Sequence, residues 1–219
     1  MTTTESKNTK TKIHTVYKLK DGTRVPSVTT ILGILAKPAL IDWAWRCGCE
    51  GIDYKAVRDQ AGDIGKLAHY LIMCHLKNQK PDTSEYSIQD INKAETCLIK
   101  YWDWEKETPI EPVIVEEALV SEKYGFGGTI DCLAKLNDEL ILIDHKTGKG
   151  IWPEMFYQLA AYRALLEEYG YYITSARILR IGKNENEGFE QRIMIDLSKQ
   201  WQIFQYCLKI YRLQNGILT

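Results

Sequence analysis

Two apolar segments near the middle of the chain are patterned as β-strands and lie only two residues apart. Residues Gly128–Leu136 are rich in side chains that suit a pleated strand, and Glu139–Lys146 contains the apolar run Leu140–Ile143. Asn137 and Asp138 separate the two segments, and both residue types tolerate the positive φ angles that a two-residue turn requires. The pattern therefore predicts a tight β-hairpin.

Elsewhere the apolar positions recur either at a helical period of three to four residues or in short runs typical of strands. Predicted helices begin at Pro38 and Pro153, occupy residues 52–78 as one helix or two, and cover Ser87 to about Lys106 and Lys199–Gln214. Further strands are predicted at Ile13–Leu19, Pro112–Ser121, Ile173–Ile181 and Phe189–Leu197. Residues 1–12 are polar, and we expect them to form a disordered tail before a single domain of residues 13–219.

The composition is that of an ordinary globular protein and narrows the function only slightly. The chain has 219 residues, of which 45% are hydrophobic and 26% charged, with a formal net charge of −1. A protein that coats nucleic acid without specificity is therefore disfavoured, and a nucleic-acid enzyme would need a local basic groove. No apolar run reaches the roughly 18 residues of a membrane span, so no membrane association is expected.

The predicted hairpin brings charged residues together. If Leu136 lies opposite Glu139, the same register places Asp131 opposite Asp144, with Cβ atoms roughly 4.5–5.5 Å apart. Lys146 lies two residues beyond Asp144 and points to the same face. Facing carboxylates repel each other, and a divalent cation such as Mg²⁺ would relieve that repulsion.

A simpler interpretation is a charged strand end at a loop, in which Lys146 pairs with Asp144. The joint pattern favours a functional site instead. Asp144 follows the apolar strand directly, at the point where a buried strand emerges. Gly127 and Gly128 precede Asp131 and allow another segment to approach the backbone closely.

The segments GGTID, ending at Asp131, and IDHKTG, containing Asp144 and Lys146, resemble the PD-(D/E)xK nuclease superfamily in its RecB-like exonuclease branch. In that family the first Asp and the D-x-K triplet form the metal site, and the middle residue is free, so His145 is compatible. The resemblance implies an α/β fold with a central mixed β-sheet flanked by helices, the restriction-endonuclease-like core.

Two further segments in the first third of the chain fit the same resemblance. Gly65-x-x-x-His69 is similar to the first motif of these nucleases, in which the His reaches the metal, although a lone His beside an apolar stripe is more often structural. PSVTTIL, followed by a helix with Trp43 and Trp45, resembles the start of phage and mitochondrial exonucleases and would border the DNA channel. From the residues alone, Ser27 or Thr29 can cap a helical turn, and the helix beginning at Pro38 is expected to cover the core.

After the D-x-K triplet, Gln158-x-x-x-Tyr162 places two side chains on one helix face and resembles the last motif of the branch. The resemblance implies that Gln158 holds the Lys146 region or the scissile strand and that Tyr162 packs beside the phosphate. Ser27 and Thr147, which belong to matching segments, join these two as expected DNA contacts. Either Glu116 or Glu117 can approach the metal, and a solvated strand edge is an equal alternative for both.

The mechanism that the resemblance implies uses Asp131, Asp144, Lys146 and His69 as the catalytic set. Asp131, Asp144 and the backbone carbonyl of His145 would hold Mg²⁺ or Mn²⁺, with His69 as a further ligand that favours tolerance of Mn²⁺. The metal would polarise a phosphate oxygen, and Lys146 would position the attacking water and neutralise developing charge. The products would carry a 5′-phosphate and a 3′-hydroxyl.

Together with the paired aspartates, the resemblance implies a metal-dependent DNA exonuclease that acts on single-stranded or end-processed DNA in replication, repair or recombination. The alternatives are a structure-specific endonuclease and a catalytically silent DNA-binding or recombination partner. DNA with free ends is the expected partner, with a recombination or single-strand-binding protein as a second candidate. None of the six cysteines forms a C-x-x-C pair and Cys207 stands alone near the C-terminus, so no iron–sulfur cluster is expected. We expect reduced thiols and a cytoplasmic location, in the host cytoplasm if a phage encodes the chain.

Overall fold

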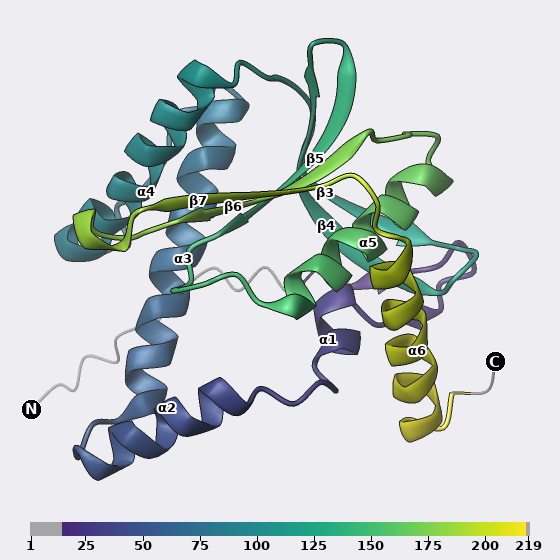
Figure 1. The fold of residues 1–219 in the computed structure, drawn as a ribbon, viewed down its shortest axis with the longest axis horizontal. Coiled ribbons are helices and arrows are strands. Elements are labelled where there is room, and N and C mark those ends of the chain that lie inside the picture. Colours follow the sequence, from purple (N-terminus) through teal and green to yellow (C-terminus); the bar gives the residue numbers. More distant parts are fainter. Residues whose placement is uncertain (1–14, 218–219) are drawn as a thin grey trace, which may run out of the picture.

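The computed structural model describes residues 15–217. Its centre is a mixed five-stranded sheet with the order β3-β4-β5-β6-β7, flanked by helices on both faces (Figure 1). Only β5 and β6 run parallel; the other neighbours are antiparallel. The predicted α/β class is confirmed. The strands are β3 (Glu111–Ser121), β4 (Phe126–Leu136), β5 (Glu139–Lys146), β6 (Ser175–Ile181) and β7 (Phe189–Met194).

Helices pack on the two faces of the sheet and bury two separate apolar clusters. One cluster joins α3 (Tyr54–Leu76) and α4 (Ile88–Glu107) to the sheet through residues such as Leu67, Tyr101 and Ile143. The other joins three helices to the opposite face, where Leu142 contributes. Neighbouring residues of β5 therefore serve opposite faces, as the pleat requires. The helices of the second face are α1 (Val28–Leu32), α5 (Pro153–Glu168) and α6 (Ser198–Gln214).

The hairpin at the centre of the sheet forms as the sequence predicts. Asn137 and Asp138 have φ angles of 51° and 65°, and Leu136 pairs with Glu139. The paired register continues back along both strands and ends where Cys132 lies opposite Ile143. The next two residues are Asp131 and Asp144, so β4 and β5 stop pairing one position before the two carboxylates.

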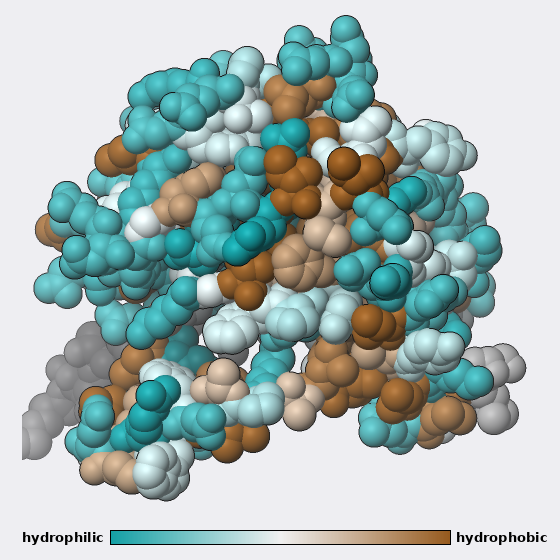
Figure 2. All heavy atoms as spheres, in the orientation of Figure 1, coloured by the Kyte–Doolittle hydropathy of each residue, from teal (hydrophilic) through white to brown (hydrophobic). Residues whose placement is uncertain are grey.

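The helix α2 (Pro38–Cys49) begins at Pro38 as predicted, but the expectation that it covers the core is wrong. Cys47 is its only buried residue, and 70% of Trp45 is exposed. Trp43 contacts Tyr54 of α3 edge to face. Figure 2 shows α2 standing out from the body as a separate lobe. Both faces of the sheet that this helix could cover are already occupied by other helices.

The remaining predicted elements fall close to their expected positions. Within residues 52–78 there is one helix, α3. The strand predicted at Ile13–Leu19 begins outside the described residues, and its described part contributes β1 (Tyr17–Lys18), which forms a small antiparallel pair with β2 (Arg24–Val25). A short 3₁₀ helix, η1 (Glu185–Glu187), lies in the loop of the second hairpin. The predicted tail at residues 1–12 lies outside the described residues. Within residues 15–217, no helix is long and apolar enough to cross a membrane.

Candidate active site

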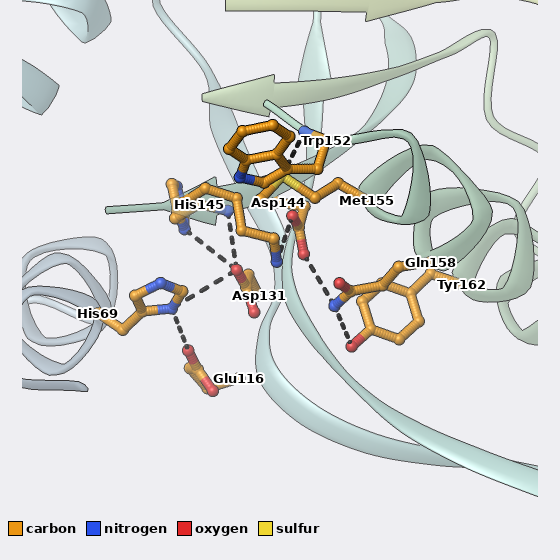
Figure 3. A network of polar contacts seen from close by, with 10 residues as sticks. His69, Glu116, Asp131, Asp144, His145, Trp152, Met155, Gln158 and Tyr162 are labelled. Atoms are coloured by element: carbon orange, nitrogen blue, oxygen red, sulfur yellow. Dashed lines mark hydrogen bonds and ion pairs between the residues drawn. The ribbon is translucent and has the colours of Figure 1, made fainter. Parts of the chain in front are cut away.

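The charged residues singled out from the sequence meet where β4 and β5 separate (Figure 3). Asp131 comes from β4 and the Asp144–Lys146 triplet from the end of β5. His69 approaches from α3, and Gln158 from α5 on the other side. Residues far apart in the chain thus converge at one end of the central hairpin.

Asp131 and Asp144 have different partners. Asp131 Oδ2 accepts a hydrogen bond of 2.8 Å from the backbone N–H of His145 and lies 3.5 Å from His69 Nδ1. Asp144 Oδ2 lies 2.6 Å from Lys146 Nζ, and its Oδ1 accepts a hydrogen bond of 3.2 Å from Gln158 Nε2. The site therefore has two halves, one on each side of the end of β5.

This arrangement corrects the expectation that the two aspartates face each other as a paired position. The side chain of Asp131 takes the backbone N–H of β5, and the ladder between the strands ends one residue earlier. The Lys146–Asp144 pairing that defined the simpler interpretation is present. Asp144 is, however, fully buried, so the pair does not lie on a solvated strand end.

A third carboxylate completes the first half of the site. Glu116 Oε1 lies 3.9 Å from His69 Nδ1, whereas Glu117 is exposed. Glu116 has a φ angle of 49°, uncommon for a residue with a side chain, and it interrupts the paired positions of β3 beside Asp131 of β4. Of the two glutamates that the sequence left open, the structure brings Glu116 to the site.

Burial and the neighbouring charges shift the pKa values of the three carboxylates differently. Burial raises the pKa of Glu116 to about 8, and the charge of Asp131 adds to this shift. Burial likewise raises the pKa of Asp144 to about 7, with Lys146 acting in the opposite direction. Burial also disfavours ionisation of Asp131, but His69, Lys146 and His145 outweigh it and hold its pKa below the ordinary value. Asp131 is thus the carboxylate that is most readily ionised.

Burial and the neighbouring charges also shift the pKa values of the two histidines and of Lys146. Burial lowers the pKa of His69, and it lowers the pKa of His145 to about 4. Burial also disfavours the charge of Lys146, but Asp144 and Asp131 outweigh it and raise the pKa of the ammonium group. At neutral pH the site therefore combines neutral imidazoles with a permanent ammonium.

The donor set fits a divalent cation. Carboxylate oxygens are the ligands that Mg²⁺ prefers, and neutral imidazoles suit transition metals. The coordinating atoms of His69, Asp131 and His145 all lie within 4.8 Å of one another. The carboxylates whose pKa values are raised would gain a partner from a bound cation, because the repulsion and burial that disfavour their charge would be offset.

A cleft of about 810 Å³ opens onto the first half of the site. Glu116, His69 and Asp131 line it together with four tyrosines and small polar residues. Lys66 is the only lysine or arginine among the lining residues in the described part of the chain, so the expected basic groove is not found there. Exposed aromatic rings in such a cleft can stack with bases. The tyrosines are Tyr17, Tyr70, Tyr86 and Tyr162.

Glycines allow the walls of this cleft to approach the strands. A Cβ atom at Gly128 would lie 2.6 Å from the Tyr162 ring, and one at Gly127 would lie 2.3 Å from the Tyr17 ring. Real Cβ atoms do not make such contacts, so the close approach predicted for the glycine pair is confirmed. The hydroxyl of Tyr17 also lies 2.8 Å from Thr129 Oγ1.

The residues expected to contact DNA do not all line the cleft. Ser27 caps α1 by accepting a hydrogen bond from the Thr30 backbone N–H, and it lines the cleft with Tyr162. Thr147 instead packs against α3, where a Cβ atom at Gly65 would lie 2.8 Å from its hydroxyl oxygen. Gln158 is buried and donates to Tyr162 Oη at 2.8 Å as well as to Asp144.

Sequence reasoning missed several residues of the cleft. Lys66, Tyr70 and Met73 line it beside His69. Lys66 and Met73 lie three and four residues from His69 and so on the same face of the helix, which is a signal that was present in the sequence; Tyr70, directly after His69, lacked that spacing. Tyr17 had no comparable signal, because only the fold brings it to Gly127.

His75 of α3 is half-buried and lies outside the cleft. Its Nε2 lies 2.6 Å from Glu105 Oε2, and its ring packs edge to face on Tyr101 and Trp102. Helix α4 supplies all three partners, which the spacing within α3 does not reveal.

No family model matches the sequence, and neither does any curated protein. Among solved structures, the fold is similar to a candidate exonuclease from Eubacterium rectale, with 10% identity, a TM-score of 0.47, and 71% of this chain and 69% of that chain covered. An alkaline exonuclease from Laribacter hongkongensis gives 13% identity and a TM-score of 0.34, covering 70% of this chain and 86% of that one. The same enzyme in complex with dAMP gives 12% and 0.33, with the same coverage. Values this low do not place the chain in a family, so its function has to be inferred from the site.

Proposed function

We propose that the chain is a metal-dependent nuclease that hydrolyses phosphodiester bonds in DNA, and that it acts from free ends as an exonuclease. One observation carries the proposal. Three carboxylates, from Glu116, Asp131 and Asp144, gather with Lys146 at one end of the central hairpin, and a cleft lined by aromatic rings opens beside them. Proteins rarely bury like charges together without a bound cation or a catalytic need.

Mg²⁺ or Mn²⁺ would be held by Asp131, Asp144 and the backbone carbonyl of His145, with His69 as a further ligand. When bound, such a cation polarises a phosphate oxygen and lowers the pKa of water. Glu116 lies close enough to His69 to take part as an additional carboxylate. A bound cation would offset the negative charge of the carboxylates and so allow an acidic substrate to approach them.

Side chains of the protein would position the attacking water, the carboxylate and the DNA strand. Lys146 is held by Asp144 at 2.6 Å, and 21% of its side chain is exposed, so its ammonium can donate to a phosphate oxygen or to the attacking water. Gln158 fixes Asp144 and Tyr162 relative to each other. Tyr162 and Ser27 would contact the DNA strand in the cleft, and Thr147 would contact it next to Lys146.

The catalytic interpretation is favoured over a silent DNA-binding protein by the burial of Asp144. A fully buried carboxylate costs stability, and a binding module has no need of it. A structure-specific endonuclease remains the alternative among enzymes. The proposal further includes a single domain in residues 13–219, a cytoplasmic location and a single-strand-binding or recombination protein as partner.

The test compares linear and covalently closed single-stranded DNA of one sequence, each with Mg²⁺, with Mn²⁺ and with excess EDTA. We expect linear strands to be degraded to products with 5′-phosphates only when metal is present, while circles resist. Equal loss of circles and linear strands supports the endonuclease alternative. Absence of cleavage with every metal contradicts the proposal.

A further inference from the structure

The residue between Asp144 and Lys146 has a side chain that the proposed mechanism does not use. That mechanism takes only the backbone carbonyl of His145, which any residue would supply. Its imidazole is 2% exposed and packs edge to face against Tyr101 of α4, with ring centroids 5.4 Å apart. Packing against Tyr101 does not by itself require an imidazole, so the choice of histidine needs a reason.

The position of the ring supplies that reason. His145 Nδ1 lies 3.7 Å from Asp131 Oδ2, and His69 Nδ1 lies 3.5 Å from the same oxygen (Figure 3). Ligand atoms that share one ion at about 2.1 Å are themselves separated by about 3–3.5 Å. Both gaps are close to this spacing and too long for direct hydrogen bonds. Two imidazoles thus flank one carboxylate oxygen at the separations of a metal site.

The same ring is incompletely partnered. His145 Nε2 is buried and has no hydrogen-bond partner within residues 15–217. Nδ1, which points at Asp131, is too far from its oxygen to hydrogen-bond. Buried polar groups without partners are rare and are often explained by an ion or a water. A metal ion among the three residues would bind Nδ1, the nitrogen that faces Asp131, and so would give a partner to this nitrogen and not to Nε2.

We propose that the His145 imidazole is itself a metal ligand and that, with His69 and Asp131, it selects a divalent first-row transition metal such as Mn²⁺ over Mg²⁺. The inference rests on the proposed function, because it concerns the ion of that same site. Imidazole nitrogen binds transition metals well, whereas Mg²⁺ strongly favours oxygen and water. A site that used only the carbonyl of His145 would lack this preference.

The experiment measures metal binding rather than activity. Protein stripped with chelator is titrated calorimetrically with Mn²⁺ and, separately, with Mg²⁺, and Co²⁺ is used as a probe by its visible absorption. His145→Leu is compared with wild type and with His75→Leu. His75 is the matched control, because its ring also lies against Tyr101, at 6.0 Å, but it pairs with Glu105 away from the site. Melting curves without metal confirm that each variant is folded.

We expect His145→Leu to bind Mn²⁺ at least tenfold more weakly and to change the Co²⁺ spectrum, while Mg²⁺ affinity changes by less than about threefold. His75→Leu should match wild type. If His145→Leu binds Mn²⁺ as tightly as wild type, or loses both metals equally, the inference is wrong although the proposed function stands. If wild type binds neither metal, the proposed function fails as well.

A second measurement needs no variant. Nitrogen-15 spectra of the histidine rings are recorded on wild type while Zn²⁺, which is diamagnetic, is added. The ring nitrogens of both His145 and His69 should shift on binding, and those of His75 should not. A shift confined to His69 would overturn the inference.

Discussion

Replacement of Glu116 by Gln should stabilise the metal-free protein by an amount that grows as the pH rises from about 4.5 to about 8 and is then at its maximum. The carboxyl group is partly buried close to Asp131, and its pKa is raised from 4.5 to about 8. Between pH 4.5 and 8, the folded protein therefore holds a proton on Glu116 that the unfolded chain has lost. The free energy of unfolding of the metal-free protein is therefore not lowered by Glu116 below pH 4.5. It falls progressively as the pH rises above 4.5, and the loss is complete once the pH has passed 8. Gln has nearly the same shape and no charge, so it avoids that loss.

The magnitude follows from the shift. One pKa unit corresponds to about 1.4 kcal/mol, so the ionised Glu116 destabilises the metal-free protein by up to about 5 kcal/mol at pH 9. For a chain of this size, 1 kcal/mol changes the melting temperature by about 2–4 °C. Glu116→Gln should therefore raise the melting temperature by up to about 10–20 °C at pH 9 and hardly at all at pH 5.

The assay is thermal unfolding in EDTA at both pH values, with Glu117→Gln as the matched control. Glu117 is adjacent in sequence but exposed, so its substitution should change stability by less than about 0.5 kcal/mol. Repeating the melts with saturating Mn²⁺ should reverse the sign, because the variant then loses a carboxylate that helps to hold the cation. An equal rise at pH 5 and pH 9, or a fall at pH 9 without metal, would refute the reasoning.

The other predictions concern catalysis, packing and proton linkage. Lys146→Ala should lower kcat by about 10²–10³-fold while Mn²⁺ still raises the melting temperature; a rate within threefold of wild type would contradict its role. Gly65→Ala should lower the melting temperature by crowding Thr147, whereas Gly62→Ala, with open space around it in the same helix, should stabilise α3 by about 1 kcal/mol; equal effects would exclude the close contact. Because cation binding must displace protons from carboxylates with raised pKa values, Mn²⁺ affinity should increase between pH 6 and 9, with proton release measurable by calorimetry in two buffers.

The turn and the strands around it were predictable because their signals are local. Asn137 and Asp138 adopt the positive φ angles that their short polar side chains tolerate. Strand β5 occupies the predicted residues because its apolar run is continuous. Gly127 and Gly128 indicated a close approach, although only the fold shows that Tyr17 and Tyr162 make it.

The arrangement of the carboxylates was less predictable, because it depends on where strands stop pairing. Extrapolation of the hairpin register placed Asp131 opposite Asp144, but β5 leaves β4 and continues in its pairing with β6 to Lys146. The approach of Glu116 depends on a backbone irregularity in β3 that alternation alone cannot reveal. Without this irregularity, Glu116 and Glu117 would be equally good candidates for approaching the metal, as they were in the prediction from the sequence.

The exposed position of α2 shows a further limit of periodicity. An amphipathic helix is recognised from its own residues, but its partner is not. Both sheet faces are already covered, by α3 and α4 on one side and by α1, α5 and α6 on the other, so α2 projects from the body. The sequence predicts the helix and its start at Pro38, and the packing of the other helices decides its place.

The central claim is that the carboxylates at the end of the hairpin are a metal-dependent nuclease site. Its most direct test is hydrolysis of 5′-labelled linear single-stranded DNA by wild type and Asp131→Asn, purified identically and assayed with Mn²⁺ and with excess EDTA. Asn can still accept the hydrogen bond from the His145 backbone, so the fold should be kept. We predict cleavage by wild type only with Mn²⁺ and a rate at least about 10²-fold lower for the variant. Undiminished cleavage in EDTA, or equal rates for the two proteins with Mn²⁺, would contradict the claim.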